Sequence, residues 1–373
     1  MGRTDKRLKI AVLHRTFRAD AGGAEAYAVA VALELAKRHE VHVFSQEIDT
    51  SLDVVTFHPI ALLFKRPRWL NQLWYALATW WQTRSGYDIV HSHENTWHGQ
   101  VQTVHVIPMR CKPLKGIGQL LKLIFSPRLW TYTALEFFRF HITAHRLWVA
   151  VSQPLRQRLS LMQPALPRTR LYAIAPGIYP RQPSTNVSDA GHQGAGTKVL
   201  LWVGNDAAKK NLNTVLIALL HLDESLHLWV VGKAMPTGPW QDRVSALGLS
   251  HRVKFLGVIS DMDQVYACAD VLLHPSLEDT FGMVVLEAMS HGVPVVVSSQ
   301  DYCGISADLT HGQNAYVLKD PLDAHEITEA VTQVMQEDAY ALYQKQALAY
   351  AQHQVWSDVA KQYEVLFQQI VTA

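Results

Sequence analysis

The sequence has few cysteines, and those it has are not spaced as pairs. Cys111, Cys268 and Cys303 lie far apart in the chain, and no C-x-x-C motif occurs. An odd number of isolated cysteines argues against a disulfide framework and against a zinc site. We therefore expect a protein of a reducing compartment.

Long uncharged apolar runs are also missing. No segment reaches the roughly 18 uncharged apolar residues needed to cross a bilayer, because the stretch from Leu62 to Trp81 is interrupted by Lys65, Arg66, Pro67 and Arg68. The polar, basic first residues lack the apolar core and the cleavage site of a signal peptide. The sequence therefore predicts a cytoplasmic protein that is either soluble or peripheral to a membrane.

Acidic residues are scarce in the first half of the chain. Residues 1–180 contain 23 Lys and Arg against 11 Asp and Glu, whereas the remaining residues contain 11 against 21. A basic half predicts contact with an anionic membrane surface or acceptor, because positive charge near acidic lipid contributes roughly 1 kcal/mol per residue. We expect no nucleic-acid partner.

The order of apolar segments predicts two α/β domains, since 373 residues exceed the size of one ordinary core. Strand-like and helical runs alternate as in parallel sheets with helical crossovers. In the first half these runs are 8–14, 24–37 (helical), 41–45, 88–91 and 101–105. In the second half the strand-like runs are 199–203, 227–231, 253–255, 271–273 and 293–298. Residues 181–197, rich in Ser, Gly and Pro, predict the connection. The carboxyl ends of both sets of strands are expected to face a shared cleft.

The most informative stretch combines a strand, a loop and a helix. We expect the strand at 271–273, the loop at 274–280 and the helix from about Gly282 to His291, ended by Gly292. Asp279 then lies in the loop and Glu287 in the helix, whose first N–H groups suit phosphate and sugar oxygens. The alternative interpretation is that Asp279 caps the helix and Glu287 is solvated.

This stretch resembles the E-x-F-G-x-x-x-x-E signature of the retaining family-4 glycosyltransferases of the GT-B fold, which has two Rossmann-like doubly wound domains. It reads Asp279, Thr280, Phe281, Gly282, Met283, Val284, Val285, Leu286 and Glu287. The resemblance implies that Glu287 binds ribose, that Asp279 binds the donor sugar, and that the Phe281 to Val284 backbone holds sugar and phosphate. Asp279 departs from the family's Glu, so its carboxylate is one methylene shorter.

A second stretch resembles the family's V-G-R-x-x-x-x-K-[GN] motif, with Gly204 after the strand and Lys210 at the lysine position. The resemblance implies that Lys210 neutralises the departing diphosphate, where a cation is required because two phosphate charges develop. Asn205 replaces the usual Arg, and Lys209 is the candidate for the second charge. The alternative is that both lysines are solvated at the start of an exposed helix.

Three further sites match the family less specifically. Gly22 and Gly23 resemble its G-G-x-E loop, in which glycine allows close approach to a phosphate or sugar, although a tight strand–helix connection is the alternative. His105 resembles the histidine of its T-x-H motif, which approaches donor sugar and acceptor, although an incidental histidine is the alternative. Val258 completes the donor-site residues that the resemblance implies.

Three neighbouring histidines do not predict a metal site. His91, His93 and His98 have no nearby cysteine and no H-E-x-x-H helix. We therefore expect no metal and no other cofactor, with a nucleoside diphosphate sugar as co-substrate.

The resemblance covers most of the chain and implies three parts. These are an acceptor-binding domain over 1–180, a nucleotide-sugar-binding domain over 181–355 and a helix over 356–373 that returns to the first domain. The APGIYP, VGNDAAKK and ADVLLHP runs look most like lipopolysaccharide-core glucosyltransferases. This implies transfer of a hexose, glucose, from a UDP-sugar to a membrane-associated glycan or glycolipid such as lipopolysaccharide core, with His105, Lys210 and Asp279 as catalytic residues.

Two other functions fit the same fold. A nucleotide-sugar epimerase would activate water and need no acceptor, and a non-catalytic scaffold would bind a nucleotide without turnover. A location at the inner face of the cytoplasmic membrane is favoured by two stretches that mix basic and aromatic residues, Leu62 to Trp81 and Met109 to Phe140. The alternative is that these stretches are buried core helices with emerging charged stems.

Overall fold

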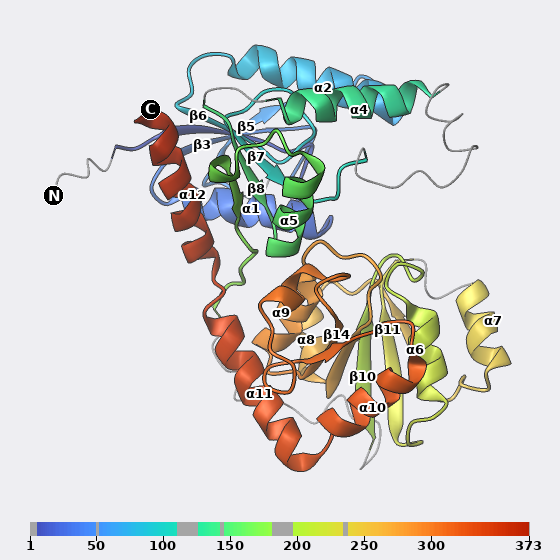
Figure 1. The fold of residues 1–373 in the computed structure, drawn as a ribbon. Helices are drawn as coiled ribbons and strands as arrows, with labels where there is room; N and C mark the ends of the chain where they lie inside the picture. The colour runs from blue at the N-terminus through green and yellow to red at the C-terminus, as the bar shows by residue number, and fades with distance from the viewer. Residues whose placement is uncertain are drawn as a thin grey trace. The chain divides into compact units, whose positions relative to one another are not determined.

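The chain folds into two compact units, each built on its own parallel sheet (Figure 1). A computed structural model describes residues 6–49, 52–109, 126–141, 145–180, 197–233 and 238–372. Unit 1 comprises Met1–Gly177 and Trp356–Ala373, and unit 2 comprises Ile178–Val355. The predicted connection, apart from residue 197, lies outside the described residues.

Unit 1 contains a seven-stranded sheet in the order β5-β3-β1-β6-β7-β8-β9, with every pair parallel. The strands are β1 (Lys9–Leu13), β3 (Glu40–Ser45), β5 (Thr56–Pro59), β6 (Ile89–Ser92), β7 (Val101–Val104), β8 (Leu147–Ala150) and β9 (Leu171–Ala173). A separate short pair joins β2 (Thr16–Phe17) to β4 (Glu47–Ile48). The apolar runs become strands because helices cover both faces and bury almost every side chain of β1, β6, β7 and β8.

The helices of unit 1 include one from the far end of the chain. They are α1 (Gly23–Ala36), α2 (Arg68–Thr83), α4 (Pro127–Arg139), α5 (Gln153–Met162) and α12 (Trp356–Val371), with a 3₁₀ turn at Arg168–Arg170. The last helix, α12, packs against α1. Tyr27 of α1 and Tyr363 of α12 share a hydrogen bond of 2.9 Å between hydroxyl oxygens, and Trp356 packs edge-on against Tyr27. The prediction of a terminal helix that returns to the first domain is confirmed by this contact.

Unit 2 contains a six-stranded parallel sheet in the order β12-β11-β10-β13-β14-β15. Its strands are β10 (Lys198–Val203), β11 (Leu226–Val231), β12 (Val253–Gly257), β13 (Val271–His274), β14 (Val295–Ser298) and β15 (Tyr316–Leu318). Its helices are α6 (Leu212–Leu219), α7 (Pro239–Ala246), α8 (Met262–Ala267), α9 (Met283–Ser290), α10 (Ala324–Val334) and α11 (Glu337–Gln352), with a 3₁₀ turn at Gly304–Ala307. Trp202, Leu216 and Val331 are among the side chains of its core.

Each sheet has one point where the strand order reverses. In unit 1 the chain builds outward from β1 through β3 to β5 and then returns to place β6 on the other side of β1. In unit 2 it builds from β10 to β12 and then returns to place β13 beside β10. Ligands of open α/β sheets bind beyond the carboxyl ends of the strands at such reversal points. Ligand-binding residues are therefore expected in the loops after β1 and β6 and in those after β10 and β13.

Within the described ranges, none of the helices combines the length and the apolar character that crossing a bilayer requires.

Candidate active site

A lysine and a carboxylate meet at the reversal point of unit 2. Lys210 lies in the loop after β10, and Asp279 lies in the loop after the neighbouring strand β13. The Nζ atom of Lys210 donates a hydrogen bond to Oδ2 of Asp279, and both side chains are less than one-fifth exposed. Two of the residues predicted from separate motifs therefore form one ion pair.

Glycines just after β10 and β11 leave room for this ion pair. A Cβ atom on Gly204 would lie 2.8 Å from Cγ of Lys210, so glycine there allows the lysine stem to pass. A Cβ atom on Gly232, at the end of β11, would lie 1.9 Å from the carbonyl oxygen of Gly204. Gly232 also has a φ of 148°, which favours glycine. The backbones beyond β10 and β11 thus approach more closely than any side chain would permit.

Asp279 is held by contacts on both its side chain and its backbone. His274, the last residue of β13, places Nε2 3.0 Å from Oδ2 of Asp279, and the N–H of Phe281 donates to Oδ1 at 3.2 Å. The Asp279 N–H donates to the carbonyl oxygen of Tyr302, and its carbonyl oxygen accepts from Gly304. The carboxylate therefore has a fixed position before any ligand arrives. It does not cap α9, whose capping position is occupied by Gly282.

Burial and the neighbouring charges together set the protonation states of Asp279, His274 and Cys303. Burial acts to raise the pKa of Asp279, but the hydrogen bond from His274 and the charge of Lys210 outweigh it and hold that pKa well below its usual range. Burial lowers the pKa of His274, and the hydrogen bond to Asp279 opposes this only in part. Burial, with the nearby Asp279 charge, raises the pKa of the Cys303 thiol. At neutral pH Asp279 is therefore a carboxylate, and the His274 imidazole and the Cys303 thiol are neutral.

Three side chains of this cluster carry atoms that can bind metals. Ligand atoms of His274, Asp279 and Cys303 lie within 4.8 Å of one another. A metal would have to displace Lys210 from Asp279, and it would have to bind a thiol whose pKa is raised, although thiolate is the binding form. This donor set suits an ion-paired carboxylate better than a metal.

Helix α9 begins directly after this loop. Gly282 has a φ of 102°, and a Cβ atom on it would lie 2.8 Å from Sγ of Cys303, so the tight entry into the helix depends on glycine. The first N–H groups of a helix, here at Met283 and Val284, have no acceptor within the helix. Together with Phe281, which is buried, these residues present a partly positive helix end beside the Lys210 and Asp279 pair.

Glu287 lies one turn further along α9 and is bonded rather than freely solvated. Its Oε2 atom accepts a hydrogen bond of 2.8 Å from the hydroxyl of Tyr266, on α8. Nδ1 of His291 lies 2.8 Å from the Glu287 carbonyl oxygen, and the rings of His291 and Tyr266 lie against each other. Glu287 is therefore an oriented carboxylate on the same helix that begins at Gly282.

The other two predicted donor residues of unit 2 are more open to solvent. Lys209 is 53% exposed and pairs with Glu278 at 3.2 Å, so it is not equivalent to its neighbour Lys210. Val258 follows Gly257 at the end of β12 and is 67% exposed. An exposed apolar side chain at the carboxyl edge of the sheet is available to contact a flat ring such as a base.

In unit 1, histidines gather at the carboxyl ends of β1, β6 and β7. Nε2 of His105, just after β7, lies 2.9 Å from Nδ1 of His93, just after β6. His14, just after β1, packs near the ring of His93. Burial, followed by neighbouring charges that include His14 and Arg139, lowers the pKa of His105 well below its usual value. His105 is therefore neutral and oriented by His93.

A chain of hydrogen bonds near this pair passes through the terminal helix α12. His91 Nε2 lies 2.8 Å from the Thr103 hydroxyl, which lies 2.8 Å from the Tyr363 hydroxyl. Tyr363 in turn bonds Tyr27, whose hydroxyl also lies 3.1 Å from the Ile174 carbonyl oxygen. Burial lowers the pKa of His91 to about 3, so this chain is uncharged. From the sequence we concluded only that these histidines do not form a metal site, and their hydrogen bonds within unit 1 were not predicted.

The predicted glycine pair begins α1. Gly23 is the first residue of the helix, and Gly22 caps it with an extended backbone that any residue adopts. A Cβ atom on Gly22 would meet only the end of the flexible Glu25 side chain, at 2.7 Å. The fold therefore does not itself require glycine at position 22.

Two charged residues at the reversal point of unit 1 were not predicted. Arg15 Nε donates to Oε2 of Glu94 at 3.0 Å, and the Arg15 N–H donates to Oε1 at 3.1 Å. Burial acts to raise the pKa of Glu94, but the Arg15 charge outweighs it and lowers that pKa. Their positions just beyond β1 and β6 are the signal that could have identified them.

Two sheets of this kind, each reversing its strand order once, define the GT-B fold. The crystal structure of WaaG, described as a glycosyltransferase involved in lipopolysaccharide biosynthesis, matches with a TM-score of 0.79 and 21% identity, over 95% of this chain and 98% of that one. Anabaena HepE in complex with UDP-glucose matches with a TM-score of 0.76 and 19% identity, over 98% and 100%. The predicted fold is confirmed.

Sequence comparison identifies the family. The family Glycosyltransferase Family 4 matches residues 21–182, and Glycosyl transferases group 1 matches residues 197–337. Lipopolysaccharide glucosyltransferase WaaG of Escherichia coli is 29% identical over 178 residues, 44% of this chain and 47% of that protein. Mannosylfructose-phosphate synthase of Agrobacterium fabrum is 29% identical over 198 residues, 48% and 43%. In these matches the chain spans a little under half the length of each curated relative. This chain belongs to the family-4 glycosyltransferases.

Proposed function

We propose that this protein transfers a hexose from a nucleoside diphosphate sugar to a glycan or glycolipid acceptor, with retention of the anomeric configuration. The observation that carries the proposal is the Lys210 and Asp279 ion pair at the reversal point of unit 2, immediately before α9. A cation, an ionised carboxylate and a helix amino end are the groups that a diphosphate sugar requires of its binding site.

Lys210 is suited to stabilise the leaving diphosphate. Its ammonium group is partly buried, so its attraction to a phosphate is screened less than that of exposed Lys209. Asp279 holds the ammonium group in place in the free protein, and an arriving diphosphate competes for it. The first N–H groups of α9 add partial positive charge without any reorganisation during the reaction.

Asp279 is suited to bind the sugar rather than to attack it or protonate it. Its lowered pKa keeps it ionised and makes it a poor acid. We assign it to accept hydrogen bonds from hydroxyl groups of the sugar, and we assign Glu287, held by Tyr266, to the ribose hydroxyls. Gly204, Lys209, Val258 and residues 281–284 complete the donor site in this proposal.

Retention follows when the acceptor attacks from the face that the diphosphate leaves. The acceptor oxygen forms a bond to the anomeric carbon as the bond to the diphosphate oxygen breaks, and the acceptor proton passes to the departing phosphate. Such a reaction needs positioning and charge stabilisation but no protein nucleophile. His105, with Gly22 and Gly23, is assigned to the sugar and acceptor side, and no metal is required.

The relatives suggest the substrates. WaaG of Escherichia coli is named a lipopolysaccharide glucosyltransferase, and HepE was solved with UDP-glucose. These names support UDP-glucose as the donor and lipopolysaccharide core as the acceptor, with the protein acting at the inner face of the cytoplasmic membrane. The exposed aromatic and basic residues of α2 and of the segment before it support membrane contact through unit 1.

A panel of nucleoside diphosphate sugars tests the donor. UDP-glucose should raise the melting temperature through binding to the folded state, and glucose or GDP-mannose should not. Incubation with UDP-glucose and lipopolysaccharide core should then yield UDP and an α-glucosylated product, unchanged by EDTA. An altered free sugar formed without acceptor would indicate an epimerase. UDP binding without turnover across a panel of glycan acceptors would indicate a scaffold.

A further inference from the structure

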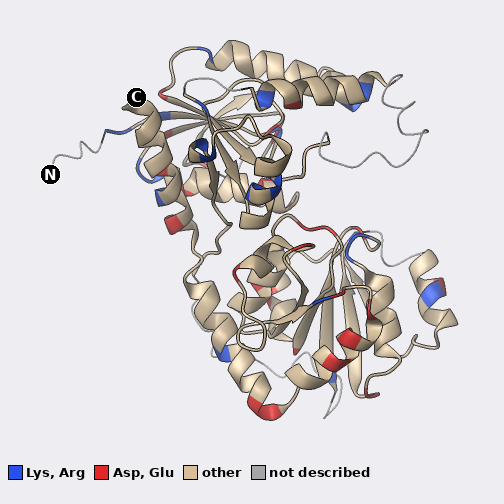
Figure 2. Cartoon of the chain, viewed as in Figure 1, with Lys and Arg blue, Asp and Glu red and all other residues tan. Residues whose placement is uncertain are grey.

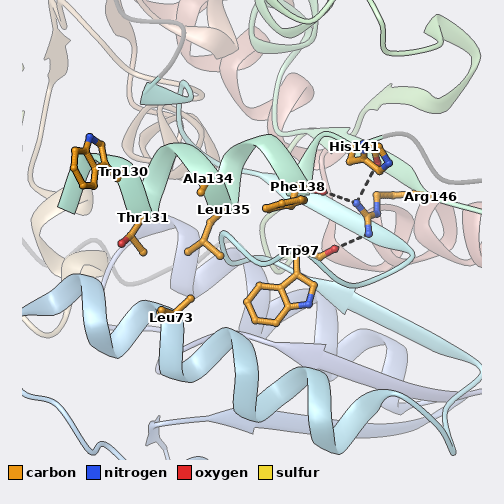
Figure 3. A pocket seen from close by; sticks show the side chains of 9 residues that line it. All are labelled: Leu73, Trp97, Trp130, Thr131, Ala134, Leu135, Phe138, His141 and Arg146. Carbon is orange, nitrogen blue, oxygen red and sulfur yellow. Dashed lines mark hydrogen bonds between the residues drawn. The ribbon is translucent and has the colours of Figure 1, made fainter. Parts of the chain in front are cut away.

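A cavity of about 650 Å³ lies between α2 and α4 in unit 1. The two helices pack against each other, and Trp97, from the loop after β6, faces the space between them (Figure 3). This volume is typical of small-molecule sites, which range from about 300 to 1,000 Å³. None of the lining residues is used by the proposed chemistry. They are Leu73, Trp97, Trp130, Thr131, Ala134, Leu135, Phe138, His141 and Arg146.

The hydroxyl and guanidinium groups that line the cavity are already bonded within the fold. The Thr131 hydroxyl donates to the Pro127 carbonyl oxygen at 2.9 Å. Arg146 donates to the carbonyl oxygens of Trp97 at 2.7 Å and Phe138 at 2.8 Å, and at 3.2 Å also to those of Gly99, Arg139 and His141. A sugar or nucleotide would find few directed partners among the apolar walls, whereas a hydrocarbon chain needs none.

Two apolar stripes continue from the cavity onto the outer surface. Leu73, Leu77, Trp80 and Trp81 are exposed at helical spacing along α2. On α4 the exposed residues Trp130, Ala134, Phe137 and Phe138 repeat the same spacing. Trp81 is 61% exposed and Trp130 is 57% exposed. A helix ordinarily buries its apolar stripe, so two adjacent helices that expose one are suited to lipid.

The charges beside the stripes suit anionic lipid. Residues 62–84 contain Lys65, Arg66, Arg68 and Arg84, all exposed, and no acidic residue. Figure 2 shows the Lys and Arg positions of unit 1, and the first 180 residues of the sequence hold about two basic residues for each acidic one. Basic residues that flank exposed tryptophan are the pattern of a protein seated at a headgroup interface.

The cavity runs along α4 from Trp130, near the amino end of the helix, to Phe138, near its carboxyl end. Helix α4 ends shortly before β8 begins, so its amino end, with Trp130, lies toward the carboxyl edge of the sheet of unit 1. Trp130 and Phe138 are separated along the helix by about 12 Å, the rise of eight residues. A hydrocarbon chain seated in the cavity would lie along this length.

We infer that the cavity between α2 and α4 seats one hydrocarbon chain of a lipid-linked acceptor. The inference rests on the proposed function for the identity of the acceptor, but the chain-binding site itself stands on the cavity. The cavity would bind the lipid part of the acceptor, and unit 1 would position the sugar hydroxyl of that acceptor for the reaction.

Binding of an alkyl glycoside tests the site without any turnover. Dodecyl maltoside, kept below its critical micelle concentration, should bind the full chain saturably with one molecule per protein, and maltose should not bind. Ala134→Trp fills the cavity from an exposed position of α4 and should weaken binding about tenfold or more, the effect of losing two buried methylene groups. Phe137→Ala, on the stripe but not in the cavity, is the matched control and should change affinity less than about twofold.

Three results would overturn the inference. Equal affinity in Ala134→Trp and the unaltered protein would remove the cavity from binding. A loss in Phe137→Ala as large as in Ala134→Trp would assign binding to the outer stripe. Full displacement of dodecyl maltoside by phosphatidylglycerol vesicles would assign the seat to a bilayer lipid instead of the acceptor.

Transfer assays separate this inference from the proposed function. Ala134→Trp should raise KM for intact lipopolysaccharide core several-fold and leave KM for the deacylated core unchanged. Equal effects on both acceptors would contradict the inference even if transfer is normal. Absence of transfer to any acceptor, with UDP-glucose still shifting the melting temperature, would contradict the proposed function, and the dodecyl maltoside measurement would still decide the site.

Discussion

The ammonium group of Lys210 bonds the carboxylate of Asp279, although 69 positions separate the two residues in the chain. The contact exists because β10 and β13 are neighbours in the sheet of unit 2, so the loops that follow them lie side by side. It places opposite charges at one point, where a diphosphate and a sugar can each find a partner.

Lys210→Ala should lower kcat by about 10²- to 10³-fold, the usual effect of removing one group that stabilises developing charge. Steady-state kinetics with UDP-glucose provides the measurement, and circular dichroism checks that the variant folds. Lys361→Ala is the control, because Lys361 is exposed, pairs with Asp358 on the surface of α12 and has no part in the proposed donor site. Similar kcat values for the two variants would remove Lys210 from the proposed role.

Asp279→Asn should destabilise the protein at pH 7 by about 1–3 kcal/mol, because the buried Lys210 and His274 lose an ionised partner. The Asp279 pKa is lowered in the folded state, so its stabilising effect is present above the unfolded pKa of about 3.9 and is lost as pH falls toward the lower folded value. Urea unfolding from pH 5 to pH 2 should show a flatter decline in the variant. Parallel curves would contradict the assignment.

Buried neutral histidines of unit 1 should make the protein less stable below about pH 6.5. The unfolded chain takes up a proton near that pH, whereas burial lowers the folded pKa of His91 to about 3. At pH 5.5 this histidine alone should reduce the free energy of unfolding by about 1.4 kcal/mol relative to pH 7.5. In the His91→Met variant, the difference between the free energies of unfolding at the two pH values, measured with urea, should be smaller by that amount. His325→Met, at an exposed position, is the control, and it should leave this pH-dependent difference in the free energy of unfolding unchanged.

Gly232→Ala should destabilise the protein by at least about 2 kcal/mol, because the new Cβ atom would collide with the Gly204 carbonyl oxygen and its φ is unfavourable for alanine. Thermal unfolding provides the measurement. Gly238→Ala is the matched control, since its φ is also positive at 87° but no atom lies within 4 Å of the added carbon. Equal melting temperatures for the two variants would show that the close approach of the strand ends has no cost.

Much of the fold could be predicted because its signals are local. The apolar runs at 8–14 and 199–203 became the central strands β1 and β10, since a strand covered on both faces needs apolar residues throughout. Gly292, expected to stop a helix, has a φ of 72° just after α9. Short edge strands such as β5 and β9 were not predicted, because partly exposed strands carry a weaker apolar signal.

The candidate site was predictable only in part. The motifs assigned Lys210, Asp279 and Glu287 to one donor site, but His274 was predicted only as the first residue of the following loop, whereas it is the last residue of β13. Its contact with Asp279 depends on side-chain direction at the strand terminus, for which the sequence has no marker.

By itself the sequence determined the central strands β1 and β10 and the glycine that follows α9, because apolar runs and backbone freedom are properties of neighbouring residues. Only the tertiary structure decided that Lys210 meets Asp279, that His93 orients His105, and that α2 and α4 expose apolar stripes around a cavity. These contacts depend on the order of the strands in each sheet and on which helix faces are covered by other elements. Both result from the packing of segments that are far apart in the sequence.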